Sequence, residues 1–367
     1  MNPQPIAVDR CNRGVPIVSP SSNWFETGVT FNAAATYLDR SSANDRIIQT
    51  LLPMRRLQDP ELAHGVVVIH YRARPETDPG LPFVRSFIGL ALFTPDYKLL
   101  HRYQEPVLYP APMTDGADYL GVEDPRITRI GNFFYMVYCG LKYDPETVYH
   151  VQLCVARSED LLHWEKLGPV KGDVNKTYNK DGVLFPERID GKYVLLHRPW
   201  TKTTAHADYA MHVAVSDAPD GVWQDLGEIL RAHRSPRFEE TWIGAGSVPI
   251  PVGDGRYIMI YHTGNSQPGG KVEYDLDLAS LDMGRLRSNP AGIVTARIEP
   301  FMIPETPEEL ASTSSLQVQN VLFTCGSYEY GDFIYIVYGG ADTYLLVARV
   351  RRSEVLSALE RAASGAS

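Results

Sequence analysis

Two adjacent carboxylates in the segment GVEDPRIT, residues 121–128, are the first side chains in this sequence that could do chemistry. Glu123 and Asp124 stand side by side and are followed by Pro125 and Arg126. A carboxyl group can give a proton to a leaving oxygen, and a carboxylate can take one from water. Acidic pairs of this kind are usually solvated turn residues, so the pair alone does not identify a site.

Other polar side chains stand where predicted strands begin or end, and together they fit glycosidic chemistry. Taken singly, a histidine at a strand end is most often a packing residue and an arginine is usually a salt-bridge residue. A pocket that combined them would hold carboxylates, arginine, lysine and histidine without the ligand spacing of a metal site. In glycoside cleavage an acid with a raised pKa protonates the leaving oxygen. These residues are Arg72, Lys180, Asp181, His197, Arg198, His262 and Asp342.

A repeated hairpin pattern predicts the elements that would bring these residues together. A short strand ends in Gly or Asp-Gly and is followed by an alternating strand rich in aromatic and β-branched residues. The turn glycines are Gly131, Gly191, Gly255 and Gly331. Further strand pairs follow the first two copies, so the repeating unit has about 60 residues, which suits a four-stranded propeller blade.

Upstream, GVVVIHYRARP and SFIGLALFTPDYKLL supply an equivalent unit without the tight turn. The resulting five units predict a five-bladed β-propeller, with the last blade closed by a strand from one terminus. The alternatives are a pair of β-sandwiches or a six-bladed ring. A short helix is expected at 45–57, broken at Pro53, and another after the last strand. We expect one domain, with the propeller over about 12–350 and a C-terminal helical extension over about 351–367. Equivalent strands of different blades converge on the central axis, which raises the odds that their polar residues form a site.

The composition of the chain makes several classes of binding partner unlikely. There are 35 Lys and Arg against 44 Asp and Glu, with no strongly basic run, so nucleic acid or an anionic membrane is not expected. The four cysteines are scattered without a CxxC motif and predict buried free thiols. The N-terminal residues do not resemble a signal peptide and no long apolar run is present, so we expect a cytoplasmic protein without metal or organic cofactor. A homo-oligomer is possible.

Several longer motifs resemble glycoside hydrolase family 130. They are GVEDPRIT, KDGVLFPERIDGKYVLLHRP, IGAGSVPI with IYHTG, and YGGADT, in this order along residues 12–350. The resemblance implies a five-bladed propeller that cleaves β-mannosides with inversion, either by phosphorolysis or by hydrolysis. It makes Asp124 the proton donor and Arg126 a support for its loop. It also implies mannose-binding roles for Asn32, Arg72, Asp181, Arg198 and Asp342.

The choice between phosphorolysis and hydrolysis depends on the charge of the nucleophile's site. A phosphorylase needs cations to hold phosphate, whereas an inverting hydrolase needs a second carboxylate to activate water. The positions that carry an Arg and a Lys in phosphorylases of the family align with Gln152 and Trp242. Acidic residues occur where phosphate would sit, beside Tyr274, which phosphorylases also place near phosphate. These are Glu239, Glu240 and Glu273.

The sequence therefore predicts an inverting β-mannosidase, acting on β-1,2-linked mannosides and releasing mannose. Asp124 would be the acid, and Glu273 with Glu239 or Glu240 would supply the base. The first alternative is a mannoside phosphorylase that uses inorganic phosphate to give mannose 1-phosphate. The second is a carbohydrate-binding propeller without catalysis. A furanosidase of the same fold is disfavoured, because its Trp-x-Asn-Asp-Pro-Asn-Gly start is missing.

Overall fold

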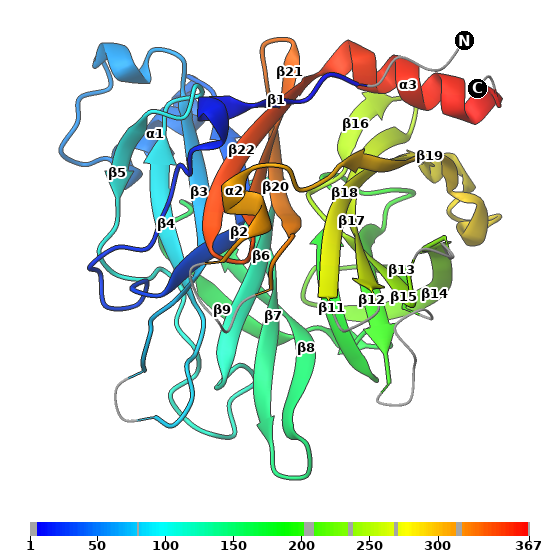
Figure 1. Ribbon diagram of the computed structural model, residues 1–367, viewed down its shortest axis with the longest axis horizontal. Coiled ribbons are helices and arrows are strands. Elements are labelled where there is room, and N and C mark those ends of the chain that lie inside the picture. The colour runs from blue at the N-terminus through cyan, green and yellow to red at the C-terminus, as the bar shows by residue number, and fades with distance from the viewer. Residues whose placement is uncertain are drawn as a thin grey trace.

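The strands form five sheets arranged around a common axis, as Figure 1 shows. This computed structural model describes residues 6–78, 81–201, 209–233, 238–267, 271–312 and 318–365. In each sheet neighbouring strands run antiparallel from the axis outward, except for one short parallel pair at the outer edge of one sheet, and most innermost strands contact the innermost strand of the next blade. The five-bladed propeller predicted from the repeats is confirmed.

The blades follow one another along the chain. Blade 1 contains β2 (Val29–Leu38), β3 (Val66–Arg74), β4 (Phe87–Phe93) and β5 (Leu99–Arg102). Blade 2 contains β6 (Gly121–Ile130), β7 (Phe133–Asp144), β8 (Val148–Ser158) and β9 (Glu165–Pro169). Blade 3 contains β11 (Tyr178–Leu184), β12 (Tyr193–Trp200), β13 (Ala210–Ser216) and β14 (Val222–Arg231), with β10 (Lys171–Gly172) on its outer edge. Blade 4 contains β15 (Glu240–Ala245), β17 (Arg256–Gln267), β18 (Lys271–Asp282) and β19 (Val294–Met302), with β16 (Ile250–Gly253) beside β17.

Blade 5 is closed by the N-terminal segment, as expected from the sequence. It contains β20 (Leu322–Tyr330), β21 (Phe333–Gly340) and β22 (Tyr344–Arg351), and β1 (Asp9–Arg10) pairs antiparallel with β22. Figure 1 places the two termini at the same end of the molecule, beside α3 (Arg352–Ser364). The first and last parts of the chain therefore hold the ring together.

The predicted hairpin turns are confirmed by their backbone conformation. Gly131, Gly191, Gly255 and Gly331 have φ of 63°, 78°, 69° and 59°, in the region that favours glycine. Blade 1 has no such tight turn between β2 and β3. Its connection instead carries α1 (Ser42–Leu51) and η2 (Pro60–Leu62).

The helices contribute little to the site. The Ser41 side chain caps α1, which ends before Pro53 as predicted. Val355 and Leu359 of α3 are buried against the outer side of blades 4 and 5. The remaining short helices are η1 (Cys11–Gly14), η4 (Met283–Arg285), η5 (Pro290–Gly292) and α2 (Pro307–Leu310).

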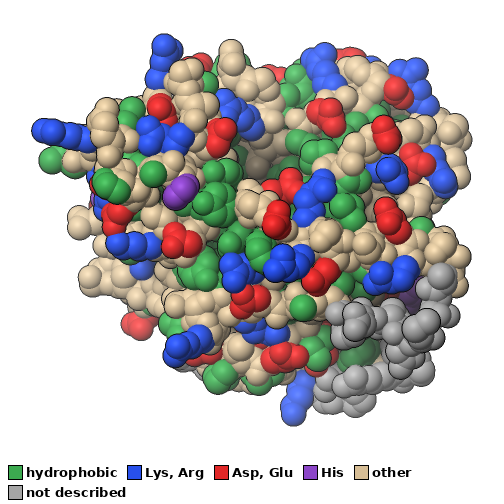
Figure 2. Space-filling model, turned by 90° about the horizontal axis from the view of Figure 1, so that it is seen from above, with side chains coloured by type: hydrophobic (Ala, Val, Ile, Leu, Met, Phe, Trp, Pro, Cys, Tyr) green, Lys and Arg blue, Asp and Glu red, His purple; other side chains and the backbone are tan. Residues whose placement is uncertain are grey.

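Charges are mixed over the face that Figure 2 shows. Blue and red side chains alternate there with apolar ones, and neither sign gathers in one region. The four cysteines are buried and unpaired, as predicted. Among the described residues, no helix has both the length and the apolar character needed to span a membrane.

Candidate functional site

Three inner strands carry a β-bulge that aims a short polar side chain at the axis. The register shifts between Phe31 and Ala33 in β2, and comparable shifts occur in β6 and β11. The bulged residues Asn32, Asp124 and Asp181 have φ of 42°, 51° and 57°. Asn and Asp tolerate this left-handed conformation better than other side chains with a Cβ, and a bulge redirects a side chain out of the normal alternation.

Asp124 lies at the centre of these groups. Its carboxylate is 4% exposed, accepts a hydrogen bond from Asn32 Nδ2 at 2.9 Å and pairs with Arg72 Nη1 at 3.2 Å. Burial favours its neutral form, but Arg72, Lys180 and Arg126 outweigh burial and hold the pKa below its ordinary value. The free protein therefore keeps Asp124 as a carboxylate, and Asp124 would acquire its proton only in a complex.

Glu123 contacts two cations of the site. It pairs with Arg72 and lies 3.5 Å from Lys180 Nζ. Arg126 is fully buried and supports the loop, as predicted. It donates to the main-chain carbonyls of residues 124, 245 and 246 and contacts Asp181 at 3.2 Å.

Asp181 links this centre to blades 3 and 4. Its second oxygen lies 3.2 Å from Arg198 Nη2 and 3.6 Å from His262 Nε2. Burial raises the pKa of this carboxyl, but the charges of Arg198 and Arg126 and the nearby His262 Nε2 lower it further than burial raises it. Burial also lowers the pKa of His262, so its ring is held neutral. Gly244 lies against both side chains and leaves room for them.

Asp342 is the carboxyl of the site that titrates near neutral pH. It lies in the turn between β21 and β22, next to Ala341, and both residues have positive φ. Burial raises its pKa to about 7, with Asp124 and Glu123 adding to the rise against Arg72 and Lys180. Asp342 can therefore carry or release a proton under physiological conditions, in addition to the sugar-binding role predicted for it.

The two positions where a phosphorylase would carry cations hold neutral groups with partners of their own. Gln152 Nε2 donates to the Ala117 carbonyl at 2.8 Å. The Trp242 indole donates to the Tyr274 hydroxyl at 3.0 Å, and the Tyr274 ring lies 6.0 Å from the His262 ring. Trp242, Tyr274 and His262 therefore give this wall of the site an aromatic surface.

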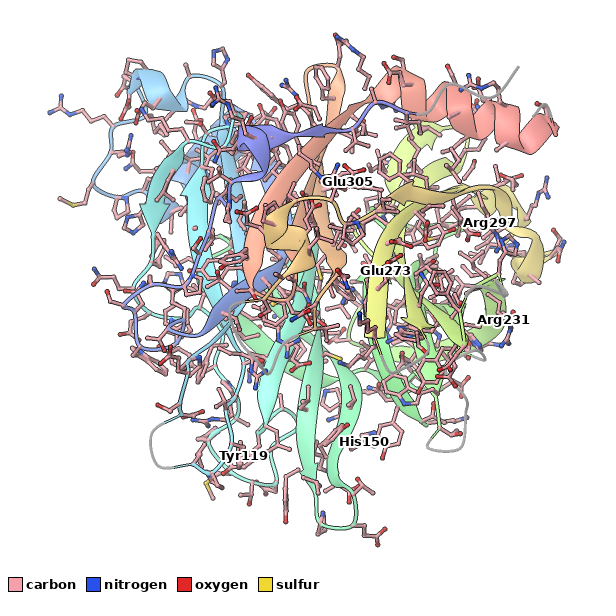
Figure 3. The ribbon with its side chains drawn as sticks, viewed as in Figure 1. Tyr119, His150, Arg231, Glu273, Arg297 and Glu305 are labelled. Atoms are coloured by element: carbon pink, nitrogen blue, oxygen red, sulfur yellow. The ribbon has the colours of Figure 1, made fainter. Side chains whose placement is uncertain are left out.

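Glu273 does not join the Asp124 cluster. It precedes Tyr274 on β18, and neighbouring residues of a strand point to opposite faces. It lines a separate cavity of about 460 Å³ with His233, Asp275 and Glu299. Figure 3 shows it in the same half of the view as Arg231 and Arg297. Within the described part of the chain, no hydrogen bond or ion pair connects Glu273 to Asp124, so the structure does not support the predicted base.

The other two glutamates differ in position. Glu239 is exposed, and its main-chain N–H donates to the Ser266 carbonyl. Glu240 shares the face of β15 that carries Trp242, and its charge raises the pKa of Tyr209. Glu240 is thus the one of the three predicted bases that lies toward the site.

The sequence predicted that His197 binds substrate, but the structure places its side chain away from the site. It points to the face of β12 opposite Arg198, is 1% exposed and accepts a hydrogen bond from Asn179. It therefore does not contact a substrate held by Arg198. The sequence analysis missed Asn179 and Gly244. The available signals were strand alternation around Arg198 for Asn179 and the two closely spaced glycines of IGAG for Gly244.

Comparisons with known proteins agree with this arrangement. The model of glycoside hydrolase family 130, described as β-1,4-mannooligosaccharide phosphorylase, matches residues 59–361. A 1,2-β-oligomannan phosphorylase of Thermoanaerobacter sp. (strain X514) is 34% identical over 64% of this chain and 70% of its own. A β-1,2-mannobiose phosphorylase of the same organism is 30% identical over 93% of this chain and 96% of its own.

Solved structures share the fold. One, reported with the finding that the family of mannoside phosphorylases contains hydrolases targeting β-1,2 mannosidic linkages in Candida mannan, superposes with a TM-score of 0.71. It is 21% identical, and the match covers 96% of both chains. At this identity the likeness concerns the fold alone.

Proposed function

Because this chain belongs to glycoside hydrolase family 130, we propose that it is a phosphorylase that cleaves β-1,2-linked mannosides with inorganic phosphate. Phosphate attacks the anomeric carbon from the face opposite the leaving oxygen, and that oxygen receives a proton. With β-1,2-mannobiose the products are α-mannose 1-phosphate and mannose, because inversion changes the anomeric configuration.

The observation that carries this proposal is the position of Glu273. A hydrolase needs a carboxylate that activates water, and the predicted base faces a different cavity from Tyr274. Two other carboxylates of the site are already paired, since Glu123 contacts Arg72 and Lys180, and Asp181 contacts Arg126 and Arg198. A phosphorylase needs no base, because phosphate is itself the nucleophile. The curated relatives described above support the same choice.

The residues then have separate tasks. Asp124 serves the proton transfer to the leaving oxygen, and the bulged Asn32 and Asp181 bind sugar hydroxyls beside it. Arg72 and Arg198 hold these carboxylates in place. The charge of Arg198 acts on Tyr274, and the His262 ring lies 6.0 Å from the Tyr274 ring, so both groups would be near the phosphate.

The test is turnover of β-1,2-mannobiose with and without phosphate. We expect mannose 1-phosphate only when phosphate is present, and we expect β-1,4-mannobiose to react more slowly. Asp124→Asn should lower kcat/KM about 100-fold or more while leaving the melting temperature close to that of the wild type. Equal release of mannose with and without phosphate would instead establish a hydrolase.

An inverting mannosidase is the second candidate. It is favoured by the neutral Gln152 and Trp242, both of which make hydrogen bonds within the protein and add no charge to a phosphate site. Glu240 is the carboxylate that would then activate water. Asp124→Asn and Glu240→Gln would both abolish activity in a hydrolase, whereas a phosphorylase would tolerate Glu240→Gln.

A further inference from the structure

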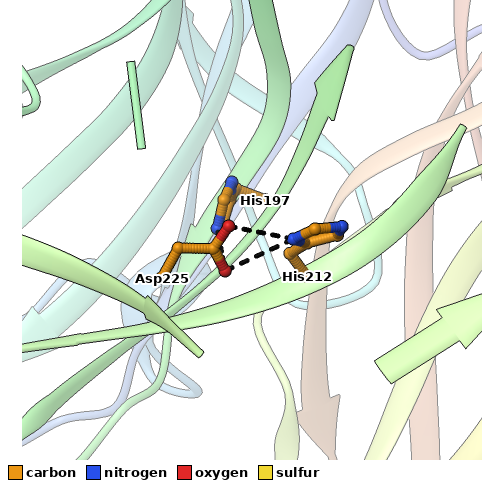
Figure 4. Close-up of side chains that lie close together, drawn as sticks. All are labelled: His197, His212 and Asp225. Carbon is orange, nitrogen blue, oxygen red and sulfur yellow. Dashed lines mark hydrogen bonds and ion pairs between the residues drawn. The ribbon is translucent and has the colours of Figure 1, made fainter. Parts of the chain in front are cut away.

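A partly buried polar network lies behind the sugar site, on the reverse face of blade 3. Figure 4 shows Asp225 between His197 and His212. Asp225 Oδ2 lies 3.0 Å from His212 Nδ1, and Asp225 Oδ1 lies 3.5 Å from His197 Nε2. Asn179 completes the network on the other side of His197. Nothing in the proposed mechanism uses these side chains.

Asn179 links this network to the site. It is fully buried, and its Oδ1 accepts the main-chain N–H of Arg198 at 3.1 Å. Its Nδ2 donates to the Val174 carbonyl and to His197 Nδ1, the latter at 2.9 Å. Three contacts therefore fix which end of the amide is oxygen and which is nitrogen.

The orientation of Asn179 determines the tautomer of His197. Since Nδ1 accepts a hydrogen bond from the amide, the proton of the neutral ring is on Nε2. That nitrogen is buried and makes no hydrogen bond of normal geometry, but it lies 3.5 Å from Asp225 Oδ1, an acceptor that suits an N–H group. Burial lowers the pKa of His197 although Asp225 opposes this, so the ring is neutral at pH 7.

The same tautomer argues against a metal centre here. One ligand atom from each of His197, His212 and Asp225 lies within 4.8 Å of the others, close enough to suggest one. A neutral histidine that binds a metal through Nε2 carries its proton on Nδ1 and donates it to an acceptor. Here Nδ1 faces the Asn179 NH₂ group, which is a donor. The arrangement suits a hydrogen-bond network better than a metal ligand.

We propose that Asn179 and His197 are positioning residues for the sugar site, acting through the main chain of β11 and β12. Asn179 directly precedes Lys180 and Asp181, and its side chain holds the N–H of Arg198. It thereby fixes the bulge of β11 against β12, where Asp181 and Arg198 meet at 3.2 Å. This inference rests on the proposed function, in which Asp181 binds a sugar hydroxyl and Arg198 holds Asp181 in place.

Asn179→Asp is the discriminating change because it alters charge and not shape. The new carboxylate can still accept from Arg198, but its other oxygen faces the Val174 carbonyl and His197 Nδ1, which are both acceptors. The conflict with the ring disappears when His197 takes a second proton and donates to both carboxylates. The titratable groups facing His197 are Asp225 and His212, and the Cys139 thiol contacts the Asn179 carbonyl from blade 2.

The sign of the pH effect follows. In Asn179→Asp the doubly protonated ring is the form that keeps Arg198 in place, and its pKa is raised by two carboxylates. Activity should be present below that pKa and lost as the pH rises through it. We expect kcat/KM to fall about tenfold or more at about pH 8 and to recover severalfold toward about pH 6, relative to wild type.

Asn175→Asp is the matched control. Asn175, like Asn179, makes three hydrogen bonds, but all of them go to the main chain, at Leu153 and Val170, in the segment that leads into β11. No contact joins its side chain to Arg198. Both variants should lower the melting temperature, but Asn175→Asp should keep kcat/KM within about twofold, without the pH-dependent recovery.

A second measurement does not depend on folding of a variant. Nitrogen chemical shifts of the wild-type histidines should show His197 protonated on Nε2 alone at neutral pH. An Nδ1–H tautomer, or one equivalent of bound zinc that is lost in His197→Gln, would overturn the network. Equal kcat/KM losses in Asn179→Asp and Asn175→Asp would overturn the positioning role alone. A wild-type protein that neither binds mannose nor cleaves mannobiose would instead reject the proposed function.

Discussion

At the scale of single residues, Asp342 is a buried carboxyl whose ionisation the site opposes. Its pKa is raised to about 7 by burial, Asp124 and Glu123, even though Arg72 and Lys180 favour the charged form. A carboxyl with a raised native pKa stabilises the fold at low pH, and this contribution is lost as pH rises from its unfolded value to about 7.

Asp342→Asn should therefore change the pH dependence of stability. The amide resembles the protonated acid and pays no charge penalty, so the variant should gain roughly 2 to 4 kcal/mol over wild type above neutral pH and little near pH 4. Thermal melts of the free protein across this range measure the difference. The exposed Asp254 supplies a control, because Asp254→Asn should give a constant offset. A constant offset for Asp342→Asn as well would contradict the raised pKa.

The residue types predicted which residues form the site, but the face of the strand to which each side chain points was harder to predict. Asp124, Asp181, Arg198, His262 and Asp342 were all chosen from their places at strand ends. The errors came from neighbours on one strand, since His197 and Arg198 cannot face the same side of a regular strand, nor can Glu273 and Tyr274. Strand alternation, which can be read from the sequence, separates the two members of each pair.

At the scale of elements, the β-bulges decide which residues reach the axis. Without the bulge in β11, Lys180 and Asp181 would point to opposite faces, yet both contribute to the site. Hairpins could be predicted because turn glycines and alternating strands leave local signals. A bulge depends on register with the next strand, so only the repeated polar residue at Asn32, Asp124 and Asp181 marked it.

Substitution of Gly244 in β15 tests how closely this strand packs against Asp181 and His262. A Cβ at this position would lie 2.2 Å from Asp181 Oδ2 and 2.5 Å from His262 Nε2. Gly244→Ala should therefore displace Asp181 from Arg198 and lower kcat/KM by about 100-fold. Steady-state kinetics at saturating phosphate measure this effect.

Gly89→Ala is the control for steric strain alone. Its Cβ would lie 2.5 Å from the Tyr71 ring, in blade 1 and apart from the site residues. Both variants should lose about 1 to 3 kcal/mol of stability by overpacking. If Gly89→Ala reduced kcat/KM as much as Gly244→Ala, the loss would reflect general strain and not the position of Asp181.

At the scale of the whole molecule, the site exists only while the ring is closed. Its residues come from all five blades if His262 and Asp342 are included, so no single blade could hold a mannoside. The sequence predicted closure by a terminus but could not show how it is held. The structure shows that Arg10 of β1 binds Glu309 at 2.8 Å and Glu305 at 2.7 Å.

Two ion pairs of the closing strand β1, Arg10 with Glu309 and Asp9 with Arg349, should contribute very different free energies to stability. Glu309 is completely buried, and its lowered pKa reflects contacts with Arg10 that outweigh burial. Removing Arg10 leaves that carboxylate without its cation, so Arg10→Met should cost about 3 kcal/mol. Arg349 of β22 pairs at 2.8 Å with the exposed Asp9, the neighbour of Arg10 in β1. Arg349→Met should therefore cost about 1 kcal/mol of stability or less.

Chemical denaturation measures the stability lost in Arg10→Met and in Arg349→Met. Repeating it at low pH shows whether the loss in Arg10→Met depends on the charge of Glu309. Glu309 has a lowered native pKa, so its contribution is present above its unfolded pKa and disappears as pH falls through the native value. The loss caused by Arg10→Met should therefore shrink below about pH 4, where the carboxyl can be protonated. Activity should fall together with the folded fraction, because opening of blade 5 moves Asp342 away from Asp124. Equal losses in the two variants, or a loss in Arg10→Met that persists at low pH, would mean that β1 closes the ring by strand pairing without help from the buried ion pair.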